Sequence, residues 1–443
     1  MNRFAYRYLF YVGFALTILA YLCFYSCQQH QNSTIAWMDG LEVATDTIAC
    51  QEVFHDSGSD ELFVKEDIDL NGKRCSLPKG VTINFQGGVI KNGTLIGDET
   101  RIECTGVCFD RVRILGTWDV PDISTAMFCD LDYDNSLKDV VALANAKVNN
   151  RIVIEKGDYQ VSALPTDPVC LRIYGNTEFI LDGTIRLVPN EYSHYYILQV
   201  EGENIEIEGH GLIIGDKHTH TGTTGEWGIG IRLSPTHHVS VSGLSIKDCW
   251  GDCIYVGEKS TDVLIENCHL DHGRRQGISI TSANGVTIRD CEISNVGGTN
   301  PEYGIDVEPN AGDLVDDVMI EKVTVRDCKG GFSVYGYAEN ARVGKVCIND
   351  SEVSAFKKAV ITARKCDTVI VENCDIKQRS GWWTIEYADV SYGVLRNNTL
   401  HYDKGLVSLT KNLARQVMGK KKMKVLDITN CKTVSIEQNK GME

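Results

Sequence analysis

The feature that most constrains the fold is a repeat of about 23 residues in the second half of the 443-residue chain. Seven segments follow one pattern: apolar, any, apolar, two polar or turn residues, variable, any, apolar. They are VSVSGLSI from Val239, VLIENCHL from Val263, VTIRDCEI from Val286, VMIEKVTV from Val318, VCINDSEV from Val346, VIVENCDI from Val369 and GVLRNNTL from Gly393. Apolar residues two positions apart predict short strands, and no segment holds two turns of helical spacing.

A second strand recurs in the same repeat, as WGIGI from Trp227, DCIYV from Asp252, QGISI from Gln276, YGIDV from Tyr303, GGFSV from Gly330 and KAVIT from Lys358. Because alternate residues of a strand face opposite sides, the apolar pairs predict inward rows and the residues between them outward rows. The outward rows expected are Gly230, Tyr255, Ser279, Asp306 and Ser333 and, two positions on, Arg232, Gly257, Thr281, Glu308 and Tyr335. Stacking such units buries the inner rows in one core, so we expect an all-β parallel β-helix, a single-stranded solenoid.

The N-terminal segment has a different composition. Arg3 and Arg7 precede an apolar stretch from Leu9 to Tyr25, and Cys27 follows. This pattern predicts that residues 1–27 are a signal peptide, a lipoprotein signal with Cys27 as the lipidated residue, or an uncleaved membrane anchor. We therefore expect the body of the protein to lie outside the cytoplasm, as an outer-membrane or cell-surface lipoprotein or as a periplasmic or secreted protein.

Two further regions are expected in the exported part. Glycine-punctuated short strands between Leu77 and Trp118 indicate an N-terminal β-rich, small β-helical module over residues 28–130. The β-helix domain then occupies residues 131–443. Its first segment, from Asp132, has the pattern of one short amphipathic helix, which would cap the open end of the solenoid, where strand edges are otherwise unpaired.

Charge and cysteine content exclude several classes of function. The chain has 44 Lys and Arg against 60 Asp and Glu, a net charge of -16, and no basic stripe of the kind that binds a phosphate backbone. Its 17 cysteines are spread along the length, and those of the repeat, such as Cys268, Cys291 and Cys374, are expected to stack in the interior with Asn398. We expect a monomer that binds no nucleic acid.

Several motifs resemble the pectate-lyase-like superfamily of right-handed β-helices. They are GDY from Gly157 and GHGLIIGD from Gly209 to Asp216. GDCIYV from Gly251 is similar to the DDCIAI motif of polygalacturonase-type glycoside hydrolases and keeps Asp252, although Gly251 and Gln276 replace two of that family's catalytic residues. YGIDVE from Tyr303 to Glu308 is similar to the YGFDPH motif of mannuronan C5-epimerases and related alginate lyases, with Glu308 in place of their His. The resemblance implies that the β-helix is right-handed and that the substrate is a carbohydrate.

The candidate catalytic residues are Asp306, Glu308 and Asp252. Asp306 and Glu308 share one strand and one face, which predicts carboxylates roughly 6 to 8 Å apart, within the range of an inverting glycosidase pair. Asp252 is expected two turns away. The candidate substrate-binding residues around them are Arg232, Arg274, Arg275, Gln276, Tyr303, Tyr255 and Tyr335. We therefore predict an exported polysaccharide-active enzyme, a glycoside hydrolase acting on a uronic-acid-containing polysaccharide.

Three alternatives remain open at this point. A polysaccharide lyase or epimerase would use the same groove, with arginines or a Ca²⁺ ion held by Glu302, Asp306 and Glu308 neutralising the uronate, and with Tyr303 or His272 moving the proton. A non-catalytic surface protein would bind a glycan on the same face. Lastly, Asp306 and Glu308 could pair with Arg274 and Arg275 as a salt-bridge row on the outside of the solenoid.

Overall fold

The computed structural model describes residues 46–54, 60–132, 135–379, 384–402, 418 and 425–441. The chain divides into two compact units, Met1–Val43 and Ala44–Glu443, and every described residue belongs to the second unit. The predicted signal or anchor over residues 1–27, with the lipidation site Cys27, lies outside the described residues. Among those that are described, no helix is long and apolar enough to cross a membrane.

The strands of the described residues form three sheets, and every strand pairing within them is parallel. The first sheet contains β1 (Thr47–Ile48), β2 (Glu61–Val64), β3 (Ile68–Asp69), β4 (Arg74–Ser76), β5 (Thr82–Phe85), β6 (Ile90–Glu103) and β7 (Phe109–Asp119). A short helix, α2 (Cys50–Val53), follows β1. The strands of this sheet pair only with one another. The domain boundary between residues 130 and 131 remains a prediction.

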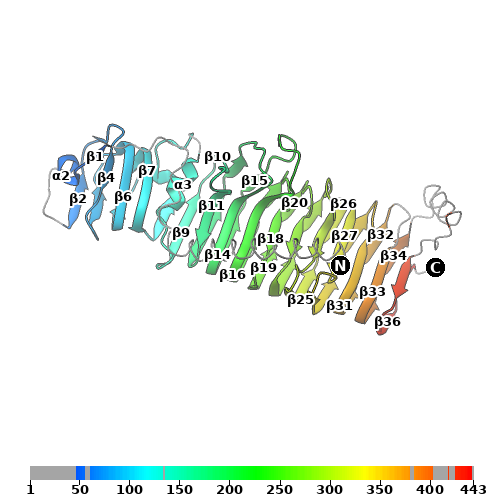
Figure 1. Ribbon diagram of the computed structural model, residues 1–443. Helices are drawn as coiled ribbons and strands as arrows, with labels where there is room; N and C mark the ends of the chain where they lie inside the picture. Colours follow the sequence, from blue (N-terminus) through cyan, green and yellow to red (C-terminus); the bar gives the residue numbers. More distant parts are fainter. Residues whose placement is uncertain are drawn as a thin grey trace, which may run out of the picture. The chain divides into compact units, whose positions relative to one another are not determined.

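The second sheet is a ladder of short strands, one from each turn of the chain. It contains β10 (Asp158–Val161), β13 (Thr184–Leu187), β15 (Leu212–Ile214), β17 (Ser245–Lys247), β20 (His269–Asp271), β23 (Glu292–Ser294), β26 (Thr324–Cys328), β30 (Glu352–Ala355), β32 (Asp375–Gln378) and β34 (Thr399–Tyr402). Figure 1 shows these strands side by side in the order of the sequence.

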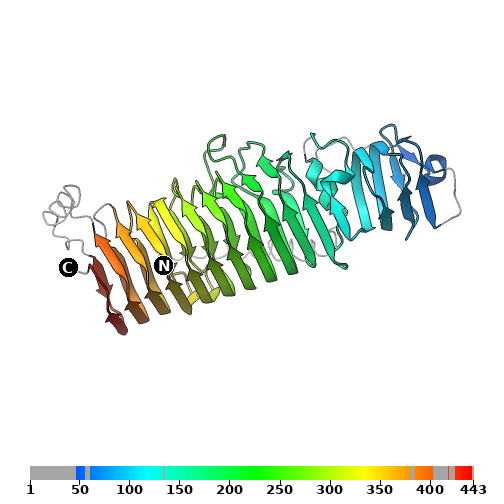
Figure 2. The same cartoon turned by 180° about the vertical axis from the view of Figure 1, so that it is seen from behind.

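The third sheet receives further strands from each turn. It contains β8 (Asp122–Ser124), β9 (Asn150–Ile154), β11 (Val169–Tyr174), β12 (Thr177–Leu181), β14 (His194–Gly209), β16 (Trp227–Ser242), β18 (Ile254–Val256), β19 (Ser260–Glu266), β21 (Ile278–Ile280), β22 (Ala283–Arg289), β24 (Tyr303–Val307), β25 (Leu314–Glu321), β27 (Gly330–Tyr335), β28 (Arg342–Val343), β29 (Lys345–Asn349), β31 (Ile361–Glu372), β33 (Ile385–Arg396), β35 (Leu426–Thr429) and β36 (Thr433–Glu437). Figure 2 shows the stack from behind.

The register of the third sheet follows the sequence repeat. The first residues of the seven repeated segments are direct partners in successive turns, from Val239 with Val263 to Val369 with Gly393. Each turn therefore hydrogen-bonds to the turn before and after it along the whole ladder, which satisfies the backbone groups of short strands that would be unstable alone. The predicted all-β parallel β-helix is confirmed.

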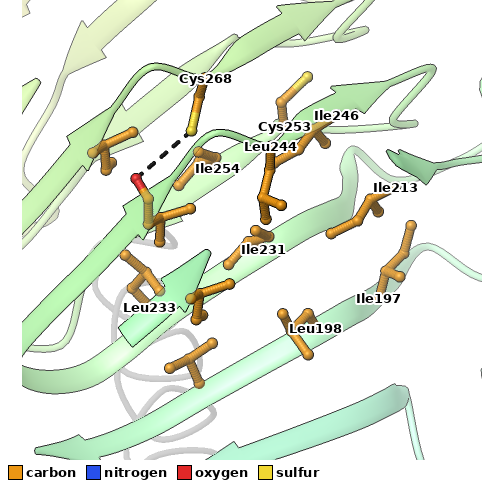
Figure 3. Packing of buried hydrophobic residues seen from close by; sticks show 14 of the residues in the cluster. Ile197, Leu198, Ile213, Ile231, Leu233, Leu244, Ile246, Cys253, Ile254 and Cys268 are labelled. Atoms are coloured by element: carbon orange, nitrogen blue, oxygen red, sulfur yellow. Dashed lines mark hydrogen bonds between the residues drawn. The ribbon is translucent and has the colours of Figure 1, made fainter. Parts of the chain in front are cut away.

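The interior is filled by the inward rows of the second and third sheets. Figure 3 shows Ile231 and Ile254 from the third sheet packed near Leu244 and Ile246. All four are fully buried, and burying a side chain of this size contributes about 1.5–3 kcal/mol. The predicted polar and sulfur corner is also inside: Cys268, Cys291, Cys374 and Asn398 are buried, and the three cysteines carry free thiols.

The predicted outward row was wrong in its first turn. Arg232, and not Gly230, is the partner of Tyr255, so this turn is shifted by two residues from the expected alignment. Gly230 instead lies against the interior, where an added Cβ would be 2.6 Å from the Cys253 carbonyl oxygen and 2.8 Å from Ile246. Glycine allows this close approach because it has no side chain.

The helix expected after Asp132 is α3 (Ser136–Val141), and a 3₁₀ turn, η1 (Thr125–Met127), precedes it. Leu137 and Val140 of α3 are fully buried against the core. Asp139 accepts the backbone N–H of Ile114, at 3.0 Å, and so ties α3 to β7 of the first sheet. The short capping helix is therefore present, and it contacts strands on both of its sides in the sequence.

Candidate functional site

One outward row of the third sheet carries most of the candidate site. Successive turns place Tyr255, Ser279, Asp306 and Ser333 in direct register. The same row extends back through Arg232 to Gln199 and on to Thr362 and Glu386. Glu308 follows Asp306 after one inward residue, Val307, at the end of β24. We call Asp252, Arg275, Gln276, Ser279, Asp306 and Glu308 the acidic cluster.

Asp306 is the most perturbed carboxyl group of the acidic cluster. Asp306 is only 2% exposed, and Gln276 Nε2 donates a hydrogen bond of 2.6 Å to its Oδ2. Burial and, after it, the neighbouring Glu308 carboxylate raise the pKa of Asp306 to about 8. Its Oδ1 has no hydrogen-bond partner within the described part of the chain. Asp306 is therefore protonated at neutral pH and holds a proton that it can donate.

The Gln276 side chain is itself fixed. Its Oε1 accepts the backbone N–H of Tyr303 at 2.8 Å, so the amide nitrogen is left to face Asp306. Gln276 is fully buried. The first residue of β24 thus sets the orientation of the amide, and the amide sets the position of the Asp306 carboxyl group.

Asp252 is the second buried acid. Arg275 Nη1 lies 3.1 Å from its Oδ2, and Ser279 Oγ donates a hydrogen bond of 2.7 Å to the same oxygen. Burial raises the pKa of Asp252, while Arg275 and Ser279 oppose that rise. Arg275 also approaches Glu308, with 3.9 Å between Nη2 and Oε2. One guanidinium therefore joins the first and last acids of the cluster. Of the predicted pairing of Asp306 and Glu308 with Arg274 and Arg275, the described residues contain only the contact between Glu308 and Arg275.

Arg274 does not contact the acids of the cluster, and its predicted role in substrate binding remains a prediction. Its guanidinium lies 3.7 Å from the centre of the Trp250 ring and donates to the carbonyl oxygens of Gly225 and Trp250. Neighbouring residues of this turn point to different sides, so Arg275 reaches the acids while Arg274 packs on an aromatic face. His272 is also elsewhere, with its Nδ1 2.6 Å from Asp271.

The predicted calcium ligands are not brought together. Glu302 forms an ion pair with Lys329, and Lys358 and Lys357 lie 3.5 and 3.9 Å from its Oε2. It also accepts the N–H of Gly298. Three ammonium groups around one carboxylate repel a further cation. Glu302, Asp306 and Glu308 are therefore not arranged as ligands of one ion in the described residues. Within the described residues, the one group with the spacing of metal ligands is His237, His238 and Asp262.

The tyrosines differ in how far they are available to a ligand. Tyr303 is 9% exposed, and burial, then Asp306, raises its pKa far above the usual value, which disfavours it as a proton shuttle. The Tyr255 hydroxyl accepts a hydrogen bond from Thr281 at 2.7 Å. Tyr335 is partly exposed beside Tyr337, with ring centres 5.2 Å apart. Tyr255 lies in the outward row one turn before Ser279, whereas Tyr303 is buried and its backbone N–H bonds to Gln276.

Arg232 lies in the same row, one turn before Tyr255. Its guanidinium packs 4.9 Å from the Tyr196 ring centre and 5.7 Å from that of Tyr255. It donates to Gln199 at 2.9 Å and pairs with Glu258. Its charge is thus already matched in the absence of a ligand.

Sequence reasoning assigned no role to Ser279, Ser333 or Glu226. The two serines stand in the predicted outward row, and this position was the signal that could have identified them; Ser279 donates to Asp252, and Ser333 lowers the pKa of Asp306. Glu226 raises the pKa of Asp252 from the loop before β16. It lies outside the repeat, so the periodic pattern carries no signal for it.

Comparisons with known proteins agree with this architecture. Residues 169–315 match the family model described as "Right handed beta helix region". The chain is 28% identical over 243 residues to the SPbeta prophage-derived uncharacterized protein YorA and 30% identical over 208 residues to the uncharacterized protein YclG, both of Bacillus subtilis (strain 168). These alignments cover 47% and 40% of this chain, and 41% and 35% of the relatives, so the chain spans less than half of their length.

A solved structure gives the same fold. The A-module of the mannuronan C-5 epimerase AlgE6 of Azotobacter vinelandii superposes with a TM-score of 0.52 at 15% identity, over 62% of this chain and 74% of that one. Together with the parallel ladders described above, the comparisons show that the chain folds as a right-handed parallel β-helix.

Proposed function

We propose that the protein is an enzyme that acts on a polysaccharide, and that it hydrolyses a glycosidic bond at the acidic cluster. The observation that carries the proposal is the protonated Asp306 next to the more exposed carboxylate of Glu308 on one strand. An acid that keeps its proton at neutral pH and a nearby base are the two groups that glycoside hydrolysis requires. The fold neighbour named as a mannuronan epimerase supports a polysaccharide as the substrate.

In this mechanism Asp306 donates its proton to the glycosidic oxygen as the bond to the anomeric carbon breaks. Glu308 removes a proton from a water molecule, and the water oxygen forms the new bond to that carbon. Arg275 holds Asp252 and approaches Glu308, and so fixes both carboxylates around the reacting atoms. The Glu308 side chain is 37% exposed and Asp306 is buried, so a substrate reaches Asp306 by displacing Glu308 or Arg275.

A lyase or epimerase reaction at the same cluster is the second candidate, and the Arg275 guanidinium favours it. A positive group beside the acids would neutralise the carboxylate of a uronate residue before a proton is removed from C5. The raised pKa of Tyr303 counts against this tyrosine as the base, and Glu308 would then take that role. Binding of a glycan without turnover is the third candidate.

The test is a panel of neutral and uronic-acid-containing polysaccharides, with new reducing ends, unsaturated uronate absorbance and the ratio of epimers measured in each case. Reducing ends without unsaturated products support hydrolysis, and unsaturated products support a lyase. A change in epimer ratio alone identifies an epimerase. Saturable binding without any product would leave a glycan-binding protein.

Variants locate the activity. Asp306→Asn and Glu308→Gln each remove one proton-transfer group with little change of shape, and each is expected to lower kcat by at least about a hundredfold. Glu372→Gln is the matched control, because Glu372 pairs with Arg396 on another outward row and has no contact with the cluster. Full activity in both cluster variants would show that the reaction takes place elsewhere.

We further propose that the protein is exported and held at a membrane through its N-terminal segment. The support is the apolar stretch that follows Arg3 and Arg7 and precedes Cys27. A Cys27→Ser variant that no longer incorporates a labelled fatty acid, and no longer sediments with membranes, would support the lipoprotein form. Unchanged membrane association without lipid would support an uncleaved anchor.

A further inference from the structure

His237, His238 and Asp262 form a cluster that the proposed reaction does not use. The two imidazole rings are in contact, with centres 3.8 Å apart. Asp262 Oδ2 lies 3.2 Å from His238 Nδ1 and 3.9 Å from His237 Nδ1. The potential ligand atoms of the three side chains lie within 4.8 Å of one another. This spacing is close to that of ligands around a single ion, where each bond is about 2.0–2.2 Å long.

The β-helix brings the three residues together through one corner that recurs in successive turns. Asn176, Asn204, His238 and Asp262 occupy equivalent positions, because Thr177 pairs with Ile205, Ile205 with Val239 and Val239 with Val263. All four have a left-handed backbone, with φ between 52° and 57°. In the first two of these turns the corner is an amide ladder, in which Asn204 Nδ2 donates to Asn176 Oδ1 at 3.1 Å.

The next two turns replace the amides by an imidazole and a carboxylate, and His237 adds a second imidazole. The turn after Asp262 has Gly285 at the corner, where an added Cβ would lie 3.2 Å from Asp262 Oδ1. No side chain of position 285 therefore covers the carboxylate. The ladder ends here in two imidazoles and one carboxylate, and Nδ1 of His237 also contacts the hydroxyl group of Thr261.

The cluster is accessible and has a recess beside it. The side chains of His237, His238 and Asp262 are 46%, 57% and 55% exposed. His238 and Asp262 also line a recess of about 680 Å³ on the outer face, whose other lining residues include Asn176, Asn204 and Glu206. An ion bound by three protein ligands would keep at least one position for water or for a ligand in this recess.

We propose that His237, His238 and Asp262 bind a divalent transition-metal ion of the zinc class. Imidazole nitrogens suit Zn²⁺, Cu²⁺ and Ni²⁺, whereas Ca²⁺ and Mg²⁺ prefer oxygen-only ligands. The ion joins two consecutive turns, because His237 and His238 belong to β16 and Asp262 belongs to β19. Binding to the folded state alone therefore also stabilises the solenoid. The proposal is independent of the reaction at the acidic cluster.

The test starts from the full chain after chelator treatment and removal of the chelator. Titration with Zn²⁺ by calorimetry is expected to show one site, and the midpoint of thermal unfolding is expected to rise with Zn²⁺ and not with Mg²⁺. His238→Asn and Asp262→Asn are each expected to weaken Zn²⁺ binding at least tenfold. The matched control is His401→Asn, because His401 is exposed and pairs with Asp375 at 2.8 Å without a second imidazole.

A spectroscopic measurement on the unaltered chain avoids any effect of the substitutions on folding. With one equivalent of Cu²⁺, the electron paramagnetic resonance spectrum is expected to show nitrogen hyperfine coupling from two imidazoles. Absence of saturable Zn²⁺ binding, a Cu²⁺ spectrum with oxygen ligands alone, or equal affinity in the His238→Asn, His401→Asn and unaltered proteins would each overturn the proposal.

Discussion

Gln276 donates a hydrogen bond to one oxygen of Asp306, and the other oxygen of Asp306 has no partner within the described residues. An ionised carboxylate buried in this way would lack most of the hydrogen bonds that stabilise its charge. The neutral, protonated carboxyl group loses less solvation free energy on burial than the carboxylate does, and this difference raises the pKa. The same arrangement gives the proposed general acid its proton and makes the stability of the fold depend on pH.

We expect the free energy of unfolding to fall as the pH rises from about 4 to about 8. The pKa of Asp306 is about 8 in the folded state, against an ordinary value of 3.8 for an aspartate side chain. Between these values the native state keeps a proton that the unfolded state has lost, so raising the pH favours unfolding by about 1.4 kcal/mol per unit for one such group. Below both values and above both values this contribution is constant.

The measurement is urea unfolding across that pH range for the unaltered chain and for Asp306→Asn. The Asn variant cannot ionise at this position, so its stability is expected to change less with pH. Parallel pH profiles for the two proteins would show that Asp306 does not hold a proton in the folded state.

Removing the Arg275 guanidinium is expected to destabilise the fold by about 3–5 kcal/mol. Arg275→Met keeps much of the side-chain volume but leaves Asp252 without its charged partner in a buried position. Adding Asp252→Asn removes the unpaired charge, so the double variant is expected to recover most of the loss. Chemical unfolding of the unaltered chain, of the two single variants and of the double variant gives the coupling free energy between Arg275 and Asp252. Additive effects would indicate that the pair does not interact.

The sequence was sufficient to predict the fold and part of the site. The register of the repeat follows from the spacing of Val239, Val263 and Val286, because period-two alternation leaves only one arrangement that buries every apolar residue. The same alternation also predicted that Asp306 and Glu308 lie on one outward face. The close approach of Gly230 to the core was not predictable, since it depends on the shape of the turn and not on the periodicity.

Side-chain direction in the turns was the other missing information. Arg274 and Arg275 are identical side chains at adjacent positions, yet Arg274 packs on Trp250 and Arg275 reaches Asp252. Glu302 was considered as a calcium ligand together with Asp306. Its backbone is left-handed, with φ of 63°, where the chain enters β24, and its carboxylate faces three lysines instead. Such choices depend on contacts between turns that the periodic pattern does not encode.

Asn398 is expected to be more important for stability than the cysteines with which it stacks. Its Oδ1 accepts the N–H of Cys374 at 2.9 Å, and its Nδ2 donates to the carbonyl oxygen of Val371 at 2.8 Å. Asn398→Ala leaves both buried backbone groups without partners, which costs about 1–3 kcal/mol for each group. Asn284→Ala, at an exposed position of β22, is the control and is expected to change stability by less than about 0.5 kcal/mol. Equal unfolding midpoints for the two variants would contradict the structural role of Asn398.

Calcium is expected to leave the acidic cluster unaffected. The Glu302 carboxylate, which a calcium site would need, is already paired with Lys329 and approached by Lys357 and Lys358. An added Ca²⁺ ion would have to displace these ammonium groups from a buried carboxylate. Addition of millimolar Ca²⁺ to dialysed protein should therefore change neither the turnover of an active polysaccharide nor the midpoint of thermal unfolding. Lys329→Gln with Lys358→Gln removes two of the competing charges, and a calcium response that appears only in this double variant would show that the lysines are what excludes the ion. A calcium response of the unaltered chain that is lost in Glu302→Gln would instead mean that Glu302 is a calcium ligand after all.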